Sequence, residues 1–345
     1  MKRRYKFGIG CLSVISVLIA INAYLWFTRE PTPIVIAEAG AGGDRVTING
    51  FPANFYRGAG EGPRPAILLL GGSEGGLREY RNVFARQLAR EGYSVLYQAY
   101  YSTTDDNKSF NMVPLETFDA SLDWLETNPD IRAGPVGIIG HSKGAEAALL
   151  VASKDDRIGA VIAAMPSDVV WQGFDFDSID MSQFSSSFAE GGEPVAYLPY
   201  ATLGWHEYFT ADEPRLEIFK LSRGLADEYP SAFIEVEEVA GPILLICGKD
   251  DTLWPGCRMA EALARRSTSN SGPATEVLAY DNAGHWAFGP AENISEGDAK
   301  FLGRMGADEK GDIAARKDQW SRILRFLSST VGDGAPDPSS EINDE

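Results

Sequence analysis

The stretch Val136-Gly-Ile-Ile-Gly140-His141-Ser142-Lys143-Gly144 decides the fold. Its first four residues form a short apolar run that predicts a buried strand, and the apolar pattern of Ala145–Ser153 predicts a helix directly after it. A Gly-x-Ser-x-Gly pentapeptide between a strand and a helix is typical of a tight, strained turn that projects the serine hydroxyl outward. The hydroxyl then lies at a helix N-terminus, where the amide dipoles favour negative charge. Ser142 is therefore the candidate nucleophile.

Apolar runs alternate with amphipathic helical patterns on both sides of this turn. Strands are predicted at Pro65–Leu70, Tyr93–Tyr100, Val136–Ile139, Ile158–Ala164, Pro242–Cys247 and Thr275–Tyr280, after a hairpin around Asn49-Gly50. Helices are predicted at Leu77–Arg90, Leu115–Glu126, Ala145–Ser153, Gly256–Arg266 and about Ile313–Leu327. Such alternation predicts an α/β protein with a mostly parallel sheet that helices cover on both faces. The alternation stops over about residues 166–240, where we expect a lid-like insert without strands.

A serine nucleophile needs a base, and the chain has only three histidines. His285 follows the last predicted strand through a Gly-containing loop, so it is the candidate base. His141 adjoins the serine and is expected to pack or form a hydrogen bond beside the turn. His206 lies in the insert, where it is at most a substrate-facing residue.

The base in turn needs an orienting carboxylate. The strand ending at Cys247 leads into Gly248-Lys-Asp-Asp-Thr-Leu-Trp-Pro255, which offers two neighbouring acids. Spacing from the strand end favours Asp251, and Asp250 is the alternative. The chain order Ser, Asp, His is that of the α/β-hydrolase fold and differs from the orders of two well-known serine protease folds.

Backbone amides beside the serine complete the predicted site. An oxyanion hole needs donors aimed at the developing negative charge. The N–H of Lys143 is the first candidate, and the Gly-rich loop Gly71–Gly76 supplies the second, from Ser73 or from Gly72. A phosphate-binding loop would end in Gly-Lys-Ser/Thr, whereas Leu77-Arg78 follows here.

Residues 1–27 differ from the rest of the chain. A basic cluster within the first six residues precedes the uncharged stretch Phe7–Phe27, which as a helix matches the roughly 30 Å thickness of a bilayer core. We expect a membrane anchor with the remainder exported to the periplasmic or extracellular side, or a cleaved signal sequence and a secreted protein. We further expect a linker over 28–43, one domain over 44–328 and a disordered acidic tail over 329–345.

Composition limits the partners. The chain has 345 residues with 31 Lys and Arg against 49 Asp and Glu, so its formal net charge is −18. Because an acidic chain repels a polyphosphate backbone, nucleic acid is not expected as a partner. The His, Cys and acidic residues show no metal-ligand spacing, and neither a metal nor a cofactor is expected. Cys247 and Cys257 flank Gly248–Pro255, here called the Asp loop, and a disulfide or two free thiols remain equally open.

These segments together resemble the C-terminal domain of the acyl-CoA thioesterase / bile acid-CoA:amino acid N-acyltransferase family. The matching pieces lie within about Pro63–Leu327 and are Leu70–Tyr80, Gly140–Ser153, Gly248–Asp251 with Trp254, and Ala283–His285. The resemblance implies an α/β-hydrolase fold and an acyl-enzyme on Ser142, with His285 as base and Asp251 as orienting acid. The family's amino-acid transferases use Cys as nucleophile and its thioesterases use Ser, so Ser142 implies the hydrolytic branch.

Two departures bear on the substrate. Only about 35 residues separate residue 27 from the first strand of the parallel sheet, so we do not expect the family's N-terminal β-sandwich domain here. We expect the catalytic part to be exported and acidic, which makes it a poor match for anionic CoA. The expected function is hydrolysis of a small-molecule acyl thioester. The alternatives are hydrolysis of a carboxylic ester of a lipid or small molecule, a peptidase, and a non-catalytic membrane-tethered binding protein.

Aromatic residues of the insert are candidates either for the acyl pocket or for the insert's own core. They are Trp171, Phe174, Phe176, Tyr200, Trp205, Tyr208 and Phe209.

Overall fold

The structure, a computed structural model, describes residues 28, 30–178, 180–292, 294 and 296–334. The predicted N-terminal anchor, at residues 1–27, lies outside these residues and stays a prediction. Among the helices that are described, none has the length and apolar character needed to span a bilayer. The chain divides into a short unit, Met1–Pro33, and a compact unit from Ile34 onward that contains everything discussed below.

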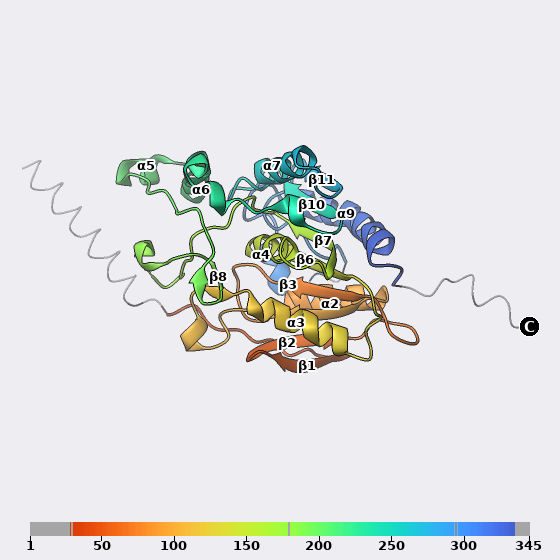
Figure 1. Cartoon of the computed structure of the whole chain (residues 1–345). Helices are drawn as coiled ribbons and strands as arrows, with labels where there is room; N and C mark the ends of the chain where they lie inside the picture. Colours follow the sequence, from red (N-terminus) through yellow and green to blue (C-terminus); the bar gives the residue numbers. More distant parts are fainter. Residues whose placement is uncertain (1–27, 29, 179, 293, 295, 335–345) are drawn as a thin grey trace, which may run out of the picture. The chain divides into compact units, whose positions relative to one another are not determined.

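The described part of the chain builds one eight-stranded sheet and one small sheet. The strands of the large sheet are β1 (Gly43–Ile48), β2 (Phe51–Tyr56), β3 (Ala66–Leu70), β4 (Ser94–Gln98), β6 (Val136–His141), β7 (Ile158–Ala164), β10 (Ile243–Gly248) and β11 (Thr275–Tyr280). Their spatial order is β1-β2-β4-β3-β6-β7-β10-β11 (Figure 1). The β1–β2 hairpin and the β2–β4 pair are antiparallel, and the other neighbouring pairs are parallel. The predicted α/β class with a mostly parallel sheet is confirmed.

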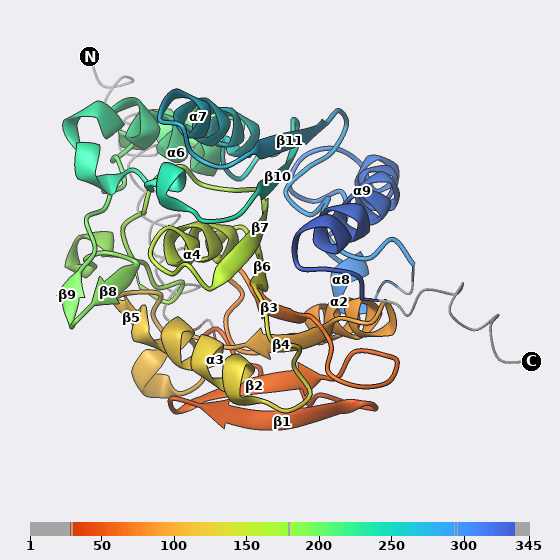
Figure 2. The same ribbon diagram turned by 45° about the vertical axis from the view of Figure 1, so that its right-hand side comes forward.

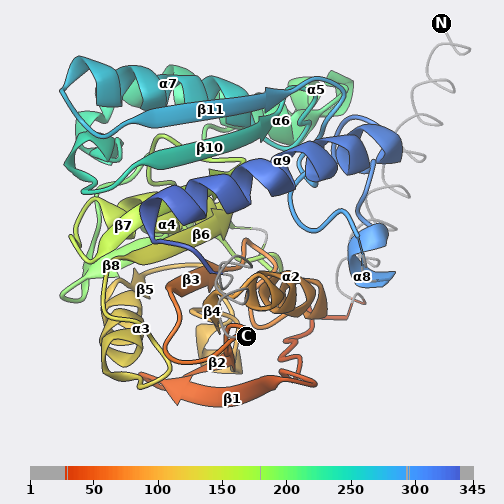
Figure 3. The same ribbon diagram turned by 90° about the vertical axis from the view of Figure 1, so that its right-hand side faces the viewer.

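Helices cover both faces of the large sheet. Their bounds are α2 (Glu79–Arg90), α3 (Glu116–Thr127), α4 (Lys143–Ala152), α7 (Gly256–Ser269), the short α8 (Glu296–Ala299) and α9 (Glu309–Thr330). Alternate side chains of β3 enter different cores: Leu68 and Leu70 pack with α3, α4 and α7, whereas Ile67 and Leu69 pack with α2 and α9. Figure 2 shows these two layers on opposite sides of the sheet, and in Figure 3 α2 and α9 lie nearest the viewer.

The insert between β7 and β10 differs in part from the prediction. It contains two short strands, β8 (Phe188–Glu190) and β9 (Glu193–Pro194), which form the small sheet with β5 (Val113–Pro114). Strands of two or three residues are too short to show periodicity, so the expectation of an insert without strands was wrong here. The insert also holds the helices α5 (Trp205–Thr210) and α6 (Pro214–Gly224).

Short 3₁₀ turns complete the described chain. They are η1 (Asp105–Asn107), η2 (Met181–Gln183), η3 (Ala226–Glu228), η4 (Pro230–Ala232) and η5 (Val236–Glu238). The insert has a core of its own in which Trp171 and Leu198 are fully buried, and Trp254 and Met259 from outside the insert join that core. The insert is therefore packed onto the Asp loop and α7.

The C-terminal helix is longer than predicted. α9 runs through Thr330 and thus includes two residues that the sequence places in the tail. Leu327 and Val331 are buried in the same core as the inner side chains of α2, and this packing extends the helix beyond its apolar sequence pattern. Most of the predicted tail, from residue 335, lies outside the described residues.

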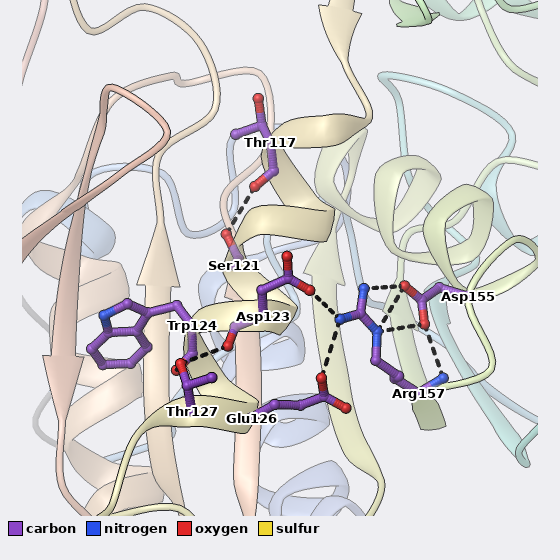
Figure 4. Close-up of polar contacts among 8 residues, drawn as sticks. All are labelled: Thr117, Ser121, Asp123, Trp124, Glu126, Thr127, Asp155 and Arg157. Carbon is purple, nitrogen blue, oxygen red and sulfur yellow. Dashed lines mark hydrogen bonds and ion pairs between the residues drawn. The ribbon is translucent and has the colours of Figure 1, made fainter.

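An ion-pair cluster joins α3 to the start of β7. The guanidinium of Arg157 lies 2.6 Å from Asp155 and 2.6 Å from Asp123, and 3.5 Å from Glu126 (Figure 4). The hydrogen bonds from Arg157 lower the pKa of Asp155. The cluster fixes the turn that leads from α4 into β7, next to the strand that carries the candidate nucleophile.

Candidate active site

Ser142 lies on the turn between β6 and α4. Its φ of +58° is in the left-handed region, which costs free energy for a residue with a side chain. The turn is tight: a Cβ on Gly140 would lie 2.0 Å from the carbonyl oxygen of Gly144, and one on Gly144 would lie 2.2 Å from that of Gly71. The two glycines of the pentapeptide are therefore required by close backbone approach.

His285 connects the serine to an acid. Its Nε2 lies 2.9 Å from Ser142 Oγ, and its Nδ1 lies 2.7 Å from Asp251 Oδ2. These partners assign the tautomer in which Nδ1–H donates to the carboxylate and Nε2 accepts from the hydroxyl. All three residues are buried, so the structure brings the three predicted side chains together.

The Asp loop presents one of its two acids to the histidine. Asp251 Oδ1 accepts hydrogen bonds from the backbone N–H groups of Leu253 (2.8 Å) and Trp254 (3.2 Å), which leaves Oδ2 facing the imidazole. The alternative acid, Asp250, is exposed. A disulfide between Cys247 and Cys257 closes this loop and settles in the structure a pairing that the sequence left open.

The loop after β3 passes beside the nucleophile. A Cβ on Gly72 would lie 3.3 Å from Ser142 Cβ, and Ser73 lines the same pocket as Ser142 and Lys143. The backbone segments proposed from the sequence as oxyanion donors are thus adjacent to Ser142. Their role as donors remains a prediction.

A buried chain of polar groups supports the loop that carries His285. The sequence analysis did not predict this chain of polar groups. Arg81 Nη2 donates to His141 Nδ1 (2.6 Å), and His141 Nε2 donates to the carbonyl oxygen of His285 (2.8 Å). Burial, together with the charge of Arg81, lowers the pKa of His141 well below its usual range, so this imidazole is neutral. Arg81 also contacts Glu74, with 3.1 Å between Nε and Oε1.

A buried ion pair on α4, the helix that follows Ser142, links this helix to the insert. Lys143 Nζ lies 2.6 Å from Glu146 Oε2 and donates to Ser187 Oγ (2.7 Å), while Glu146 Oε1 accepts from the backbone N–H of Trp171 (3.0 Å). Burial raises the pKa of Glu146 and lowers the pKa of Lys143, and the contact between them opposes both shifts. The sequence analysis missed this pair, although a glutamate inside the apolar helix sequence Ala145–Ala152 could have indicated it.

Breaking this pair should destabilise the fold. Glu146→Gln leaves the Lys143 ammonium buried without its counter-charge, so we expect the free energy of unfolding to fall by about 3 kcal/mol. The double variant Lys143→Met with Glu146→Leu removes both charges and should recover most of that loss. Urea denaturation measures both. A Glu146→Gln protein as stable as the wild type would contradict the assignment of a buried ion pair.

Ser142 opens into a pocket of about 910 Å³. Of the aromatic residues predicted to line a pocket or to form the insert's core, four line it: Phe174, Phe176, Tyr200 and Tyr208. Trp171 belongs to the core beneath, where its ring stacks on Tyr200, and Phe209 is 79% exposed. The side chain of Trp205 lies outside the described part, and His206 is exposed on α5. The described residues contain no group of three or more His, Cys, Asp or Glu placed to hold a metal ion.

Comparison with known proteins places this site in a family. The family model described as "BAAT / Acyl-CoA thioester hydrolase C terminal" matches residues 113–333, which is more than half of the chain and contains all three residues of the Ser-His-Asp cluster. The chain belongs to this family. The resemblance inferred from the sequence is thereby confirmed.

Two curated thioesterases illustrate the similarity at the level of sequence. Acyl-coenzyme A thioesterase 2, mitochondrial, of Mus musculus is 26% identical over 280 residues, which is 79% of this chain and 56% of that protein. The peroxisomal succinyl-coenzyme A thioesterase of Mus musculus is 26% identical over 290 residues, 81% of this chain and 63% of that protein. The chain thus spans less than two thirds of the length of these relatives.

Solved structures show the fold. A puromycin-hydrolyzing peptidase of Mycobacterium tuberculosis superimposes with a TM-score of 0.54 at 14% identity, covering 85% of this chain and 41% of that chain. An esterase of Pyrococcus furiosus gives a TM-score of 0.51 at 15% identity and covers 88% of this chain and 100% of that chain. Their shared architecture is α/β-hydrolase-like.

Proposed function

We propose that this protein hydrolyses an acyl thioester through an acyl-enzyme on Ser142. The observation that carries the proposal is the buried hydrogen-bonded series from Ser142 through His285 to Asp251, with Ser142 on the lining of a partly aromatic pocket. Family membership supports the substrate class, because the relatives are thioesterases by description.

The first half-reaction forms the acyl-enzyme. Ser142 Oγ attacks the thioester carbonyl carbon while His285 Nε2 takes the hydroxyl proton. Asp251 holds the imidazole in the required tautomer and stabilises the imidazolium. The backbone N–H of Lys143, with that of Ser73 or Gly72, donates to the oxyanion of the tetrahedral intermediate. When the C–S bond breaks, the imidazolium returns its proton to the leaving thiolate.

The second half-reaction releases the acid. Water attacks the acyl carbonyl, His285 takes a proton from that water, and the second tetrahedral intermediate expels Ser142 Oγ. His285 then protonates the serine oxygen, which restores the starting state. A carboxylic ester makes the same demands on these groups, so ester hydrolysis is the second candidate; the apolar side chains around Ser142 suit the acyl group of either substrate.

A substrate panel on the purified full chain tests the proposal. We expect turnover of acyl thioesters, measured as thiol release, at rates above those for p-nitrophenyl esters of the same acyl chain. Clear ester turnover with no thioester turnover would reject the thioester assignment in favour of the ester. If neither class is cleaved, the proposed activity is wrong.

A further inference from the structure

The charges around the pocket restrict the leaving group, provided that the proposed hydrolysis at Ser142 is correct. Two cationic residues, Lys143 and Arg215, occur along the described lining of the pocket. The ammonium of Lys143 is already paired with the buried carboxylate of Glu146 at 2.6 Å, so it offers no charge to a ligand. Arg215 is the remaining cation of that lining.

Two carboxylates, those of Asp175 and Asp180, lie on the lining of the pocket. Asp175 accepts hydrogen bonds from the hydroxyl of Ser109 and from a backbone N–H, both at 2.7 Å. Asp180 accepts from the backbone N–H and the hydroxyl of Ser182 at 2.9 and 2.5 Å. These donors are uncharged, so these hydrogen bonds do not offset the charge of the carboxylates.

The surroundings of the pocket add further negative charge. A second pocket beside α5 and α6 shares Leu203 with the first. Its lining includes one lysine and four acidic residues, Glu207, Asp212, Glu213 and Glu217. That lysine, Lys220, lies 2.9 Å from Glu217. The α5–α6 side of the pocket therefore presents a negative field to an approaching ligand.

Coenzyme A is a poor match for this field. It carries a pyrophosphate and a further phosphate, groups that proteins bind with several Arg or Lys side chains or with backbone N–H groups at helix N-termini. Like-charge contact with Asp175 and Asp180 would instead disfavour it, and Arg215 supplies one positive charge of the described lining against these two negative charges. The aromatic lining, by contrast, suits uncharged groups.

We propose that the substrate of Ser142 is an acyl thioester or ester with an uncharged leaving group, and that this pocket discriminates against acyl-CoA. The carboxylates of Asp175 and Asp180 are the discriminating groups, and Phe174, Phe176 and Tyr208 provide the apolar contact surface. Specificity is thus set by an element that repels the wrong leaving group as well as by contacts to the right one.

A series of three thioester substrates that differ in the charge of the leaving group tests this inference. Octanoyl-CoA, octanoyl-4′-phosphopantetheine and octanoyl-pantetheine have the same acyl group, thioester and pantetheine arm, and their phosphate content falls along the series. We expect kcat/KM of the full chain to rise along it by at least about tenfold in total at low salt. Because salt screens repulsion, the difference should shrink as ionic strength rises.

The outcomes separate the inference from the proposed function. Equal kcat/KM values for the three substrates, or a higher value for octanoyl-CoA, would overturn the inference while leaving thioester hydrolysis at Ser142 intact. No turnover of any of the three thioesters, with p-nitrophenyl octanoate cleaved, would instead reject the thioester assignment. No turnover of any substrate would reject the proposed function altogether.

A variant assigns the discrimination to named residues. In Asp175→Asn with Asp180→Asn, the ratio of kcat/KM for octanoyl-pantetheine to that for octanoyl-CoA should fall by about threefold or more. The ratio is internal to one preparation, so partial unfolding does not alter it. Glu126→Gln on α3 removes a charge outside the lining, and as a control for position it should keep the wild-type ratio. An unchanged ratio in the double Asp variant would overturn the role of these carboxylates.

Discussion

Ser142→Ala should lower kcat by about five to six orders of magnitude, because it removes the atom that we propose forms the acyl-enzyme. The fold should persist, since the hydroxyl is bonded to His285 and is not part of the core. Residual turnover should come from the proposed oxyanion donors and from binding alone. Steady-state kinetics with an octanoyl thioester measures the loss.

Ser153→Ala is a matched control for this variant. Ser153 caps the opposite end of α4, where its hydroxyl donates to the carbonyl oxygen of Leu150 (2.9 Å). This control should keep near-wild-type kinetics with at most a small loss of stability. If Ser142→Ala kept near-wild-type rates and the same thermal unfolding midpoint, the nucleophile assignment would be wrong.

Asp251→Asn should lower kcat/KM by about four orders of magnitude while preserving the shape of the loop. An amide can still accept from the N–H groups of Leu253 and Trp254 through its oxygen, so the loop keeps these bonds. Its NH₂ group, however, cannot accept from His285 Nδ1–H, and the imidazole is driven into the tautomer that cannot take the serine proton.

Asp250→Asn provides the comparison for this variant. Asp250 is exposed, and its backbone N–H donates to the carbonyl oxygen of Ala283 (3.0 Å), a bond that the substitution leaves in place. We expect less than about a twofold change in kcat/KM, as for ordinary surface substitutions. A larger loss at residue 250 than at residue 251 would exchange the two assignments.

The sheet was predictable because its strands are buried on both faces. β3, β6 and β10 are apolar at nearly every position and are followed by helical patterns, so strand and helix alternate visibly in the sequence. The insert lacks such a pattern. Strands β8 and β9 are defined by their pairing with β5 and with each other, which is a tertiary effect that no local window contains.

The catalytic candidates were predictable because each follows a strand of the parallel sheet. Ser142, Asp251 and His285 come after β6, β10 and β11, whose carboxyl ends meet at one edge. The supporting groups were not predictable in this way. Arg81 is a charged residue on α2, which a sequence pattern would leave at the surface. Its contact with His141, at the end of β6, arises only in the folded chain.

The oxyanion assignment shows a similar limit. The glycine-rich loop after β3 indicated that a backbone segment approaches Ser142, and the structure places Gly72 and Ser73 beside it. Which N–H faces the oxyanion depends on peptide orientation in that loop, and side-chain identity does not determine this orientation.

Covalent labelling with a fluorophosphonate tests the central claim most directly. Such probes react with a serine that a neighbouring base activates, so the folded wild-type chain should gain one adduct that peptide mass spectrometry maps to Ser142. The adduct should disappear in Ser142→Ala and after denaturation. Absence of labelling in well-folded protein that cleaves the substrate, or an adduct on a different residue, would contradict the account.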